Sequence, residues 1–311
     1  MRAEIRLNIA EVIILLRSDF ALLQWSKKEQ KERDYGRFLN FFYHGKRKPQ
    51  LVIEVRVTDV LPRTKGGQDK FITHHYEDGQ ENWRLKKKRG GYIFQSLVKD
   101  KEIVAFINKR FSRACAYLLP KSAKGLAWDI ADITDDFLHV LLINYLALNS
   151  LGFFAHGVGI RERDGKGRLF CGKSGAGKST TAKLWFRHSR AMILNDDRVI
   201  VRKRAKGFFL YSAPWHGEFS ANFKRRLCPA ALKELFFIYH HKKNIAKKIS
   251  PQQAFSLLYS TTFPAFWDED MLNKTAGLCA NVVQRVSCCH LGFVNDRKVI
   301  PFVRNIKRVN K

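Results

Sequence analysis

The sequence is poor in acidic residues and lacks a long uninterrupted apolar run. Of its 311 residues, 28 are Asp or Glu and 57 are Lys or Arg, which gives a formal net charge of +29. The longest apolar stretch, residues 137–160, is broken by polar side chains and by Gly152. A membrane-spanning helix needs about 20 predominantly apolar residues, so we expect a buried helix and then a strand here. The sequence therefore predicts a soluble, cytoplasmic protein that does not enter a membrane.

Cysteines are also few, and their spacing suits neither a structural metal nor a disulfide framework. The six cysteines include no Cys-x-x-Cys pair, and their only cluster is Cys288-Cys289-His290. Neighbouring residues of a strand point to opposite faces, so this cluster favours a buried strand with reduced thiols over a metal site.

The positive charge is concentrated in the middle of the chain. Residues 151–250 contain 22 basic and 6 acidic residues, whereas residues 1–100 contain 21 and 13. With 45% hydrophobic and 13% aromatic residues, the chain has ample material for a folded core. The charge distribution argues against a detachable basic tail and indicates a negatively charged partner for the middle of the protein.

Strand signals dominate the first part of the chain, and we expect residues 1–124 to form a β-rich accessory domain. The expected strands are residues 51–57, residues 83–94 with a hairpin turn at Gly90-Gly91, residues 103–107 and residues 114–119. The boundary to the next domain is expected between Pro120 and Gly125.

Helix and strand signals alternate from about residue 150 onward, so we expect residues 125–311 to form an α/β domain. Thr134, followed by two aspartates, predicts a helix N-cap. Ser250-Pro251-Gln252-Gln253 has the form of a capping box with proline at the first helical position. Residues 288–294 and 298–303 predict two short C-terminal strands.

The strongest motif is a phosphate loop of the form G-x-x-x-x-G-K-[ST], entered by a short apolar strand and left by a helical pattern. The residues expected to bind nucleotide phosphates are Gly172, Lys173, Ser174, Gly175, Ala176, Gly177, Lys178, Ser179 and Thr180. The backbone N–H groups of such a loop turn inward around a phosphate, beside the positive end of a helix. Lys178 would reach the β- and γ-phosphates of ATP, and the Ser179 hydroxyl would ligate Mg²⁺.

Two carboxylates, Asp196 and Asp197, follow the apolar strand signal at residues 191–195. We expect this strand to lie beside the loop strand and to deliver both carboxylates to the sheet edge where phosphates bind. Adjacent side chains diverge, so one aspartate could hold Mg²⁺ while the other faces an incoming hydroxyl as a base. The alternative is a strand-end turn with solvated acids. His156, within an apolar strand signal, fits a core histidine unless other site residues lie near it.

Taken together, these segments resemble the HPr kinase/phosphorylase family, whose kinase core is related to that of the ATP-dependent phosphoenolpyruvate carboxykinases. The resemblance covers about residues 135–305. It rests on His156-Gly157, a turn at Asp164-Gly165, the phosphate loop and Asn195-Asp196-Asp197, in the family's order. A Pro-Trp-x-Gly-like segment begins at Pro214. The family's Glu-x-Arg-Gly-x-Gly signature, which accompanies recognition of HPr and the phosphorylase reaction, is absent, so the resemblance implies neither HPr as the substrate nor phosphorolysis.

The resemblance implies a P-loop kinase core of the HPr kinase/phosphoenolpyruvate carboxykinase type, with ATP and Mg²⁺ as cofactors. It makes Asp197 the catalytic base, Asp196 its metal-side neighbour and His156 a residue close to the transferred phosphate. Glu218 would be a second magnesium ligand, and a homo-oligomer would be compatible with the family.

We therefore expect an ATP-dependent serine kinase that phosphorylates a hydroxyl of a protein, a peptide or a small molecule. The alternative is a nucleotide-binding regulatory protein with a nucleic-acid or acidic-protein partner and little transferase activity. This alternative rests on the net charge and the aromatic content, although no DNA- or RNA-binding signature is present.

Overall fold

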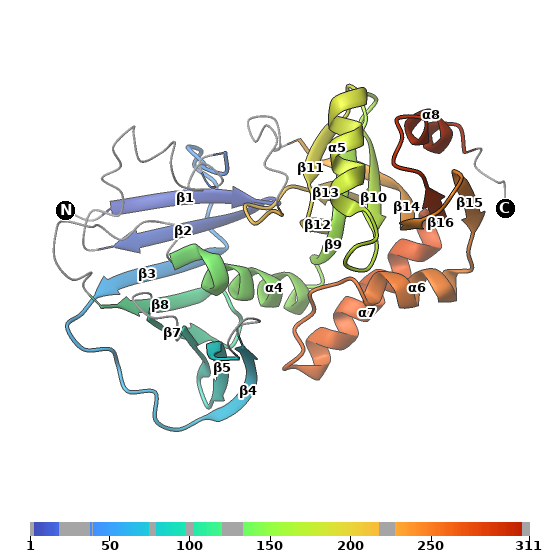
Figure 1. Ribbon diagram of the computed structural model, residues 1–311. Coiled ribbons are helices and arrows are strands. Elements are labelled where there is room, and N and C mark those ends of the chain that lie inside the picture. Colours follow the sequence, from blue (N-terminus) through green and yellow to red (C-terminus); the bar gives the residue numbers. More distant parts are fainter. Residues whose placement is uncertain are drawn as a thin grey trace. The chain divides into compact units, whose positions relative to one another are not determined.

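A computed structural model of the chain describes residues 3–18, 38, 40–74, 79–96, 102–119, 133–217 and 228–306. It divides into two compact units, one formed by Met1–Tyr145 with Phe266–Asp268 and the other by Leu146–Ala265 with Glu269–Lys311. The expected domain boundary between Pro120 and Gly125 lies outside the described residues. The fold is mixed α/β but mostly β, with two large mixed sheets and few helices (Figure 1).

The first unit is built on an eight-stranded sheet with the order β1-β2-β3-β8-β7-β6-β5-β4. Its strands are β1 (Ala3–Ile9), β2 (Val12–Ser18), β3 (Leu51–Val57), β4 (Gln68–His74), β5 (Glu81–Lys88), β6 (Gly91–Ser96), β7 (Ile103–Asn108) and β8 (Arg113–Leu118). Strand β3 pairs in parallel with β2 and β8, and the strands from β8 to β4 pair antiparallel. The strands predicted in this region, including the hairpin around Gly90-Gly91, are confirmed.

A helical segment follows, with a π-helical turn at Thr134–Leu138 and then α4 at His139–Leu148. The predicted cap is wrong, because the N-cap position is Ile133 and Thr134 is already helical. Helix α4 and the strand after it confirm the prediction of a buried helix followed by a strand. Every described helix is too short or too polar to cross a lipid bilayer.

The second unit holds the predicted phosphate loop. Its elements are β9 (Gly152–Arg161), β10 (Lys166–Cys171), α5 (Lys178–His188), β11 (Met192–Asn195), β12 (Arg198–Arg204), β13 (Gly207–Tyr211), β14 (Ala230–His240), β15 (Ile245–Lys248), α6 (Pro251–Tyr259), α7 (Glu269–Arg285), β16 (Ser287–Phe293) and α8 (Val299–Arg304). Strands β11 to β15 follow one another with no intervening helix in the described residues, so the predicted helix–strand alternation holds only around β10–α5–β11 and near the C-terminus.

The sheet of the second unit runs β10-β9-β12-β13-β14-β16-β15, and β10 also pairs with β14. These pairings close a ring through β10, β9, β12, β13, β14 and back to β10. The β10–β14 and β14–β16 pairs are parallel, whereas β10–β9 is antiparallel. The loop strand β10 is therefore hydrogen-bonded along both of its edges, which fixes the point where the phosphate loop begins.

Helices cover both faces of this sheet, and the alternation of side chains along its strands explains why. Leu169 and Cys171 of β10 pack in one core cluster with α6 and α7, and Phe170 packs in a second cluster with α5 and α8. Cys288 and Cys289 likewise divide between the two clusters, and all six cysteines are free thiols. The prediction of a buried cysteine-bearing strand at residues 288–294 is thus confirmed.

Two local predictions near the C-terminus have opposite outcomes. The capping box is present: the Ser250 side chain accepts from the Gln253 N–H, the Gln253 side chain accepts from the Ser250 N–H, and proline opens α6. The strand predicted at residues 298–303 is wrong, because this segment forms α8. A short apolar run does not distinguish a strand from a buried helix, and Val299, Ile300 and Val303 here lie on one buried helical face.

Candidate functional site

The phosphate loop has the backbone that its glycines predict. It connects the end of β10 at Cys171 to the start of α5 at Lys178. Gly175 and Gly177 have φ values of 76° and 99°, in the left-handed region that favours glycine. A Cβ added to Gly177 would lie 2.6 Å from Cζ of Phe293, so this position also needs glycine for space. The loop is held in its conformation by packing as well as by torsion angles.

The start of α5 is open to an anion. Its N-cap is Gly177, which has no side chain with which to cap the first N–H groups of the helix. Such free N–H groups, together with the helix dipole, favour a bound phosphate. The other predicted loop residues share this segment, and Lys173, Ser174 and Gly175 are exposed, while Ala176, Ser179 and Thr180 are half-buried. The structure therefore brings all nine predicted phosphate-binding residues into one strand–loop–helix unit.

Lys178 bridges the two sides of the loop. Its Nζ donates to the carbonyl oxygens of Gly172 at 2.9 Å and Lys173 at 3.0 Å. Burial lowers the pKa of the Lys178 ammonium from its ordinary value, opposed by the nearby Cys171 and Asp197. The ammonium is thus held at the mouth of the loop, within the electrostatic reach of Asp197.

A residue that the sequence did not point to, His240, also contacts the loop. Its Nε2 lies 2.8 Å from the carbonyl oxygen of Gly175, and its ring stacks on Phe293 with centroids 5.9 Å apart. His240 ends β14, which runs parallel to β10, so both strands reach the same edge of the sheet. The sequence alone could not indicate this role of His240, because the role depends on β10 and β14 being neighbours in the sheet.

Asn195 organises the turn that carries the two aspartates. Its Oδ1 accepts from the N–H groups of Asp197 at 2.9 Å and Arg198 at 3.0 Å. Its Nδ2 donates to the carbonyl oxygens of Ala213 at 3.0 Å and Trp215 at 2.8 Å. The buried amide therefore shapes the Asp196-Asp197 turn and ties it to the Pro-Trp-x-Gly-like segment, a role for Asn195 that the sequence reasoning did not assign.

The predicted placement of the acidic strand needs correction. Strand β11 was expected beside β10, but β11 pairs with β9, and β9 lies between them. Strand β9 pairs with β10 through residues 157–161 and with β12 through residues 152–156. His156 lies where β9 changes its pairing partner from β12 to β10, and its side chain contacts Asp197. This contact connects the turn that carries the aspartates with the strand beside β10.

Asp197 is the carboxylate that the structure links to the other site residues. Its Oδ1 lies 3.1 Å from Nε2 of His156, and its Oδ2 lies 3.4 Å from Nε of Arg198. Burial acts to raise the pKa of the Asp197 carboxyl, but the His156 hydrogen bond and the charges of Arg198, His156 and Lys178 outweigh it and lower the pKa. Asp197 is therefore ionised at neutral pH.

Asp196 occupies a different environment. It is buried, and its Oδ1 accepts from the Gly217 N–H at 3.0 Å. A Cβ on Gly217 would lie 2.9 Å from Oδ2 of Asp196, so the segment after Trp215 approaches this carboxylate closely. The two aspartates diverge, as the sequence predicts for neighbouring residues. Glu218, the second predicted magnesium ligand, lies outside the described residues.

His156 is half-buried at the end of the β9 segment that pairs with β12. Its N–H donates to the Thr261 carbonyl at 2.6 Å, and its ring centroid lies 6.0 Å from that of Phe263. The Arg198 guanidinium lies over the same Phe263 ring at 5.5 Å. Both side chains that flank Asp197 are thus positioned by one aromatic ring.

The donor set is compatible with ATP and Mg²⁺. No group of three or more His, Cys, Asp or Glu side chains within the described ranges could hold a metal ion. Magnesium in nucleotide sites uses one or two protein ligands and takes the others from phosphates and water. The Ser179 hydroxyl and an aspartate match this pattern, and the uncapped start of α5 matches a phosphate.

Comparison with models of known protein families and with curated proteins finds no match for this chain. The family resemblance read from the motifs therefore remains an interpretation of the residues themselves.

Proposed function

We propose that this protein is an ATP- and Mg²⁺-dependent phosphotransferase, a serine kinase that phosphorylates a hydroxyl of a protein, peptide or small molecule. The observation that carries the proposal is the position of Asp197. This carboxylate is hydrogen-bonded to His156 and lies within the field of Lys178, whose ammonium sits on the phosphate loop. A base and a phosphate-binding lysine so close together are what transfer to a hydroxyl requires.

The nucleotide-binding half of the proposal assigns a role to each part of the loop. ATP would supply the γ-phosphoryl group, and Mg²⁺ would neutralise charge on its phosphates. The N–H groups at the start of α5 would hold phosphate oxygens, and Lys178 would leave its two carbonyl partners to reach the β- and γ-phosphates. Ser179 and Asp196 are the residues assigned to the metal.

The acceptor half of the proposal rests on the two oxygens of Asp197. Oδ1 lies 3.1 Å from His156, whereas the Arg198 contact of Oδ2 is longer, at 3.4 Å, so Oδ2 is the oxygen assigned to the acceptor hydroxyl. As the hydroxyl oxygen bonds to the γ-phosphorus and the bond to the β-phosphate breaks, the hydroxyl proton passes to Asp197. Because the pKa of Asp197 is lowered, the carboxylate is ready to accept at neutral pH, and His156 and Arg198 keep it oriented.

The P-loop kinase core of the HPr kinase/phosphoenolpyruvate carboxykinase type is part of the same proposal. It is supported by the order of parts along the chain: His156 on β9, the loop after β10 and Asn195-Asp196-Asp197 after β11. It is also supported by the contacts that join these parts, which the motifs alone do not supply.

The test separates nucleotide binding from phosphoryl transfer. We would measure ATP binding and phosphoryl transfer to serine-bearing peptides and small hydroxyl compounds for wild type, Asp197→Asn and the control Asp296→Asn, a half-buried turn aspartate outside the candidate site. Asp197→Asn should still bind ATP but should lose turnover by roughly 10²–10⁴-fold, the range for a general base. Asp296→Asn should match wild type. Equal transfer by wild type and Asp197→Asn would refute the assigned base.

One observation favours the alternative of a nucleotide-binding regulator with an acidic partner. Lys242, Lys243, Lys247 and Lys248 are all exposed on or beside β15, at the edge of the sheet, and exceed what one ATP requires. Tight ATP binding without transfer, combined with salt-sensitive binding of nucleic acid or an acidic protein, would support this function instead. A filter-binding titration across salt concentrations measures it.

A further inference from the structure

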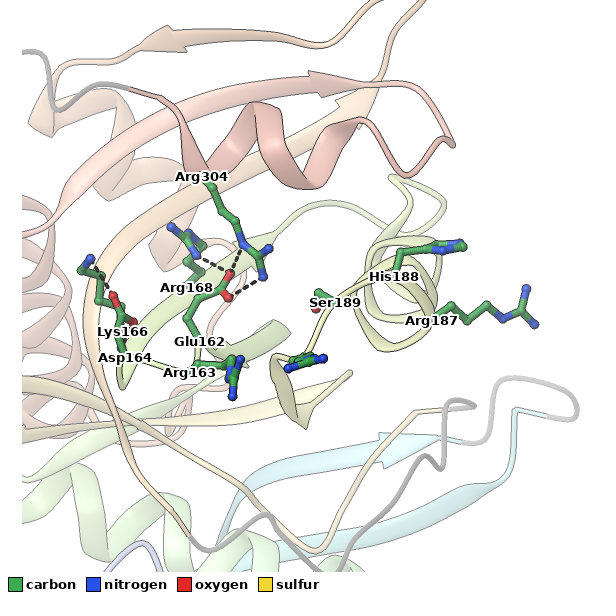
Figure 2. A pocket seen from close by; sticks show the side chains of 10 residues that line it. Glu162, Arg163, Asp164, Lys166, Arg168, Arg187, His188, Ser189 and Arg304 are labelled. Atoms are coloured by element: carbon green, nitrogen blue, oxygen red, sulfur yellow. Dashed lines mark hydrogen bonds and ion pairs between the residues drawn. The ribbon is translucent and has the colours of Figure 1, made fainter.

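A second basic site lies in the same unit, around a cavity of about 770 Å³. The cavity is lined by the β9–β10 turn, the end of α5 and the end of α8 (Figure 2). Its lining includes six cationic side chains and two acidic ones. A volume of this size lies within the range of roughly 300–1,000 Å³ that is typical of small-molecule sites.

The floor of this cavity is a buried ion network centred on Glu162. The Glu162 carboxylate pairs with Arg168, and Nη2 of Arg304 lies 2.7 Å from its Oε2. The Trp185 indole N–H also donates to it, at 3.4 Å. On its other side, Arg168 pairs with Glu234 at 2.5 Å. Figure 2 shows Arg168 and Arg304 meeting Glu162. The buried carboxylate is therefore fully engaged by its own network.

Of the cations around the opening, Lys166 has a carboxylate partner, but Arg163 and Arg190 have none among the residues that the structure describes. Asp164, the other acidic lining residue, pairs with Lys166 at 2.7 Å. Arg163 and Arg190 are exposed, and neither forms an ion pair with any residue that the structure describes. Arg187 extends away from the Glu162 network in Figure 2, so Arg163 and Arg190 are the cations available to a ligand.

The helix itself does not favour an anion here. The carbonyl end of α5 points toward this region, and a helix C-terminus carries partial negative charge. Any attraction for an anion must therefore come from side chains, and Arg187 in the last turn offsets the dipole. Guanidinium groups suit this task because they present paired donors to phosphate and carboxylate oxygens.

This cavity is separate from the candidate active site. Strand β10 begins at the cavity with Lys166 and ends at the phosphate loop, and α5 begins at the loop and ends at the cavity with His188. At about 1.5 Å of rise per helical residue, the 11 residues of α5 separate the two sites by roughly 16 Å. A ligand in the cavity cannot receive a phosphoryl group directly from the loop.

We propose that this cavity binds a small polyanion carrying two or more phosphate or carboxylate groups. Its charged groups are held by Arg163 and Arg190 at the opening. The site is independent of the proposed kinase activity, and it accounts for part of the positive charge that the binding of one ATP does not require.

The test measures the binding of inorganic pyrophosphate to the 311-residue chain by calorimetry. The phosphate loop is first saturated with a non-hydrolysable ATP analogue and Mg²⁺. The double variant Arg163→Ala/Arg190→Ala is compared with the matched control Lys203→Ala/Lys206→Ala, which removes the same charge from exposed positions beside the β12–β13 turn. Loss of charge-assisted hydrogen bonds predicts at least about tenfold weaker binding in the arginine variant and less than about twofold in the control.

A second measurement does not depend on a variant. Pyrophosphate should protect Arg163 and Arg190 of wild type from an arginine-specific reagent, read by peptide mass analysis, while leaving the reactivity of Arg187 unchanged.

An equal loss of affinity in both double variants would overturn the proposal in favour of a general field effect. Absence of saturable binding would overturn it as well, and so would tighter binding of a DNA fragment through the same arginines. Loss of pyrophosphate binding on Lys178→Ala alone would assign the probe to the phosphate loop instead.

Discussion

The two ends of α5 are both basic, yet they present positive charge in different ways. At its start, the charge comes from backbone N–H groups and one lysine that rests on loop carbonyls, beside the ionised Asp197. At its end, the charge comes from arginines: Arg168 and Arg304 pair with Glu162, whereas Arg163 and Arg190 have no carboxylate partner among the described residues. Part of the basic excess of residues 151–250 thus lies around two sites with different chemistry, for which we propose phosphoryl transfer at one and anion binding at the other.

The largest effect should come from breaking the network under the arginine-lined cavity. Arg168→Met leaves the buried Glu162 and the half-buried Glu234 without the partner that they share, which should cost about 3–5 kcal/mol of unfolding free energy. The control is Lys166→Met, which breaks the half-exposed pair with Asp164 and should cost about 0–1 kcal/mol. Urea unfolding measures both. Similar losses for the two variants would show that burial of the network does not matter.

A smaller effect is expected from glycine substitutions at the loop end. Gly177→Ala meets both a left-handed φ and the Phe293 ring, so it should cost about 2–3 kcal/mol, whereas Gly175→Ala has open space and should cost about 1 kcal/mol. Thermal unfolding gives the stabilities, and ATP titration should show weaker binding for Gly177→Ala. Pyrophosphate binding in the arginine-lined cavity should stay unchanged in both variants. If it changed too, the two ends of α5 would not be independent sites.

The smallest effect is the pH dependence that Asp197 contributes. Because the pKa of Asp197 is lowered on folding, its stabilising contribution is present above the ordinary aspartate value of about 3.9 and is lost as the pH falls through its lower folded value. The stability difference between wild type and Asp197→Asn should therefore shrink below about pH 4. Urea unfolding from pH 3 to pH 7 measures it. A difference that grew on acidification would mean that the folded protein raises this pKa.

Local sequence signals predicted local structure well. The glycine pattern predicted the strand, the loop and the helix around Lys178, and the capping box predicted the start of α6. These signals act through torsion angles and hydrogen bonds within a few residues, which a single sequence contains. The strand predicted at residues 298–303 failed because a six-residue apolar run carries no period long enough to exclude a helix.

The contacts between distant residues of the candidate site could not be predicted in the same way. The sequence named Asp197 and His156 separately, but their hydrogen bond depends on β9 lying between β10 and β11, whereas the sequence predicted that β10 and β11 are neighbours. His240 reaches the loop only because β14 is the other neighbour of β10. The arginine-lined cavity likewise combines Arg163 with Arg304, and no spacing rule connects residues so far apart. Each of these contacts is set by sheet topology.

The closed ring of strands also sets the order in which the protein can fold. Strand β10 pairs with β9 across a short turn, but its other partner, β14, supplies residues such as Glu234, which is 66 positions beyond Arg168. Contacts between such distant residues form late, because the loop entropy must be lost before they add stability. His240, which supports the phosphate loop, lies on that late strand. The nucleotide binding that we propose should therefore appear only in the final phase of refolding, after most of the sheet has formed.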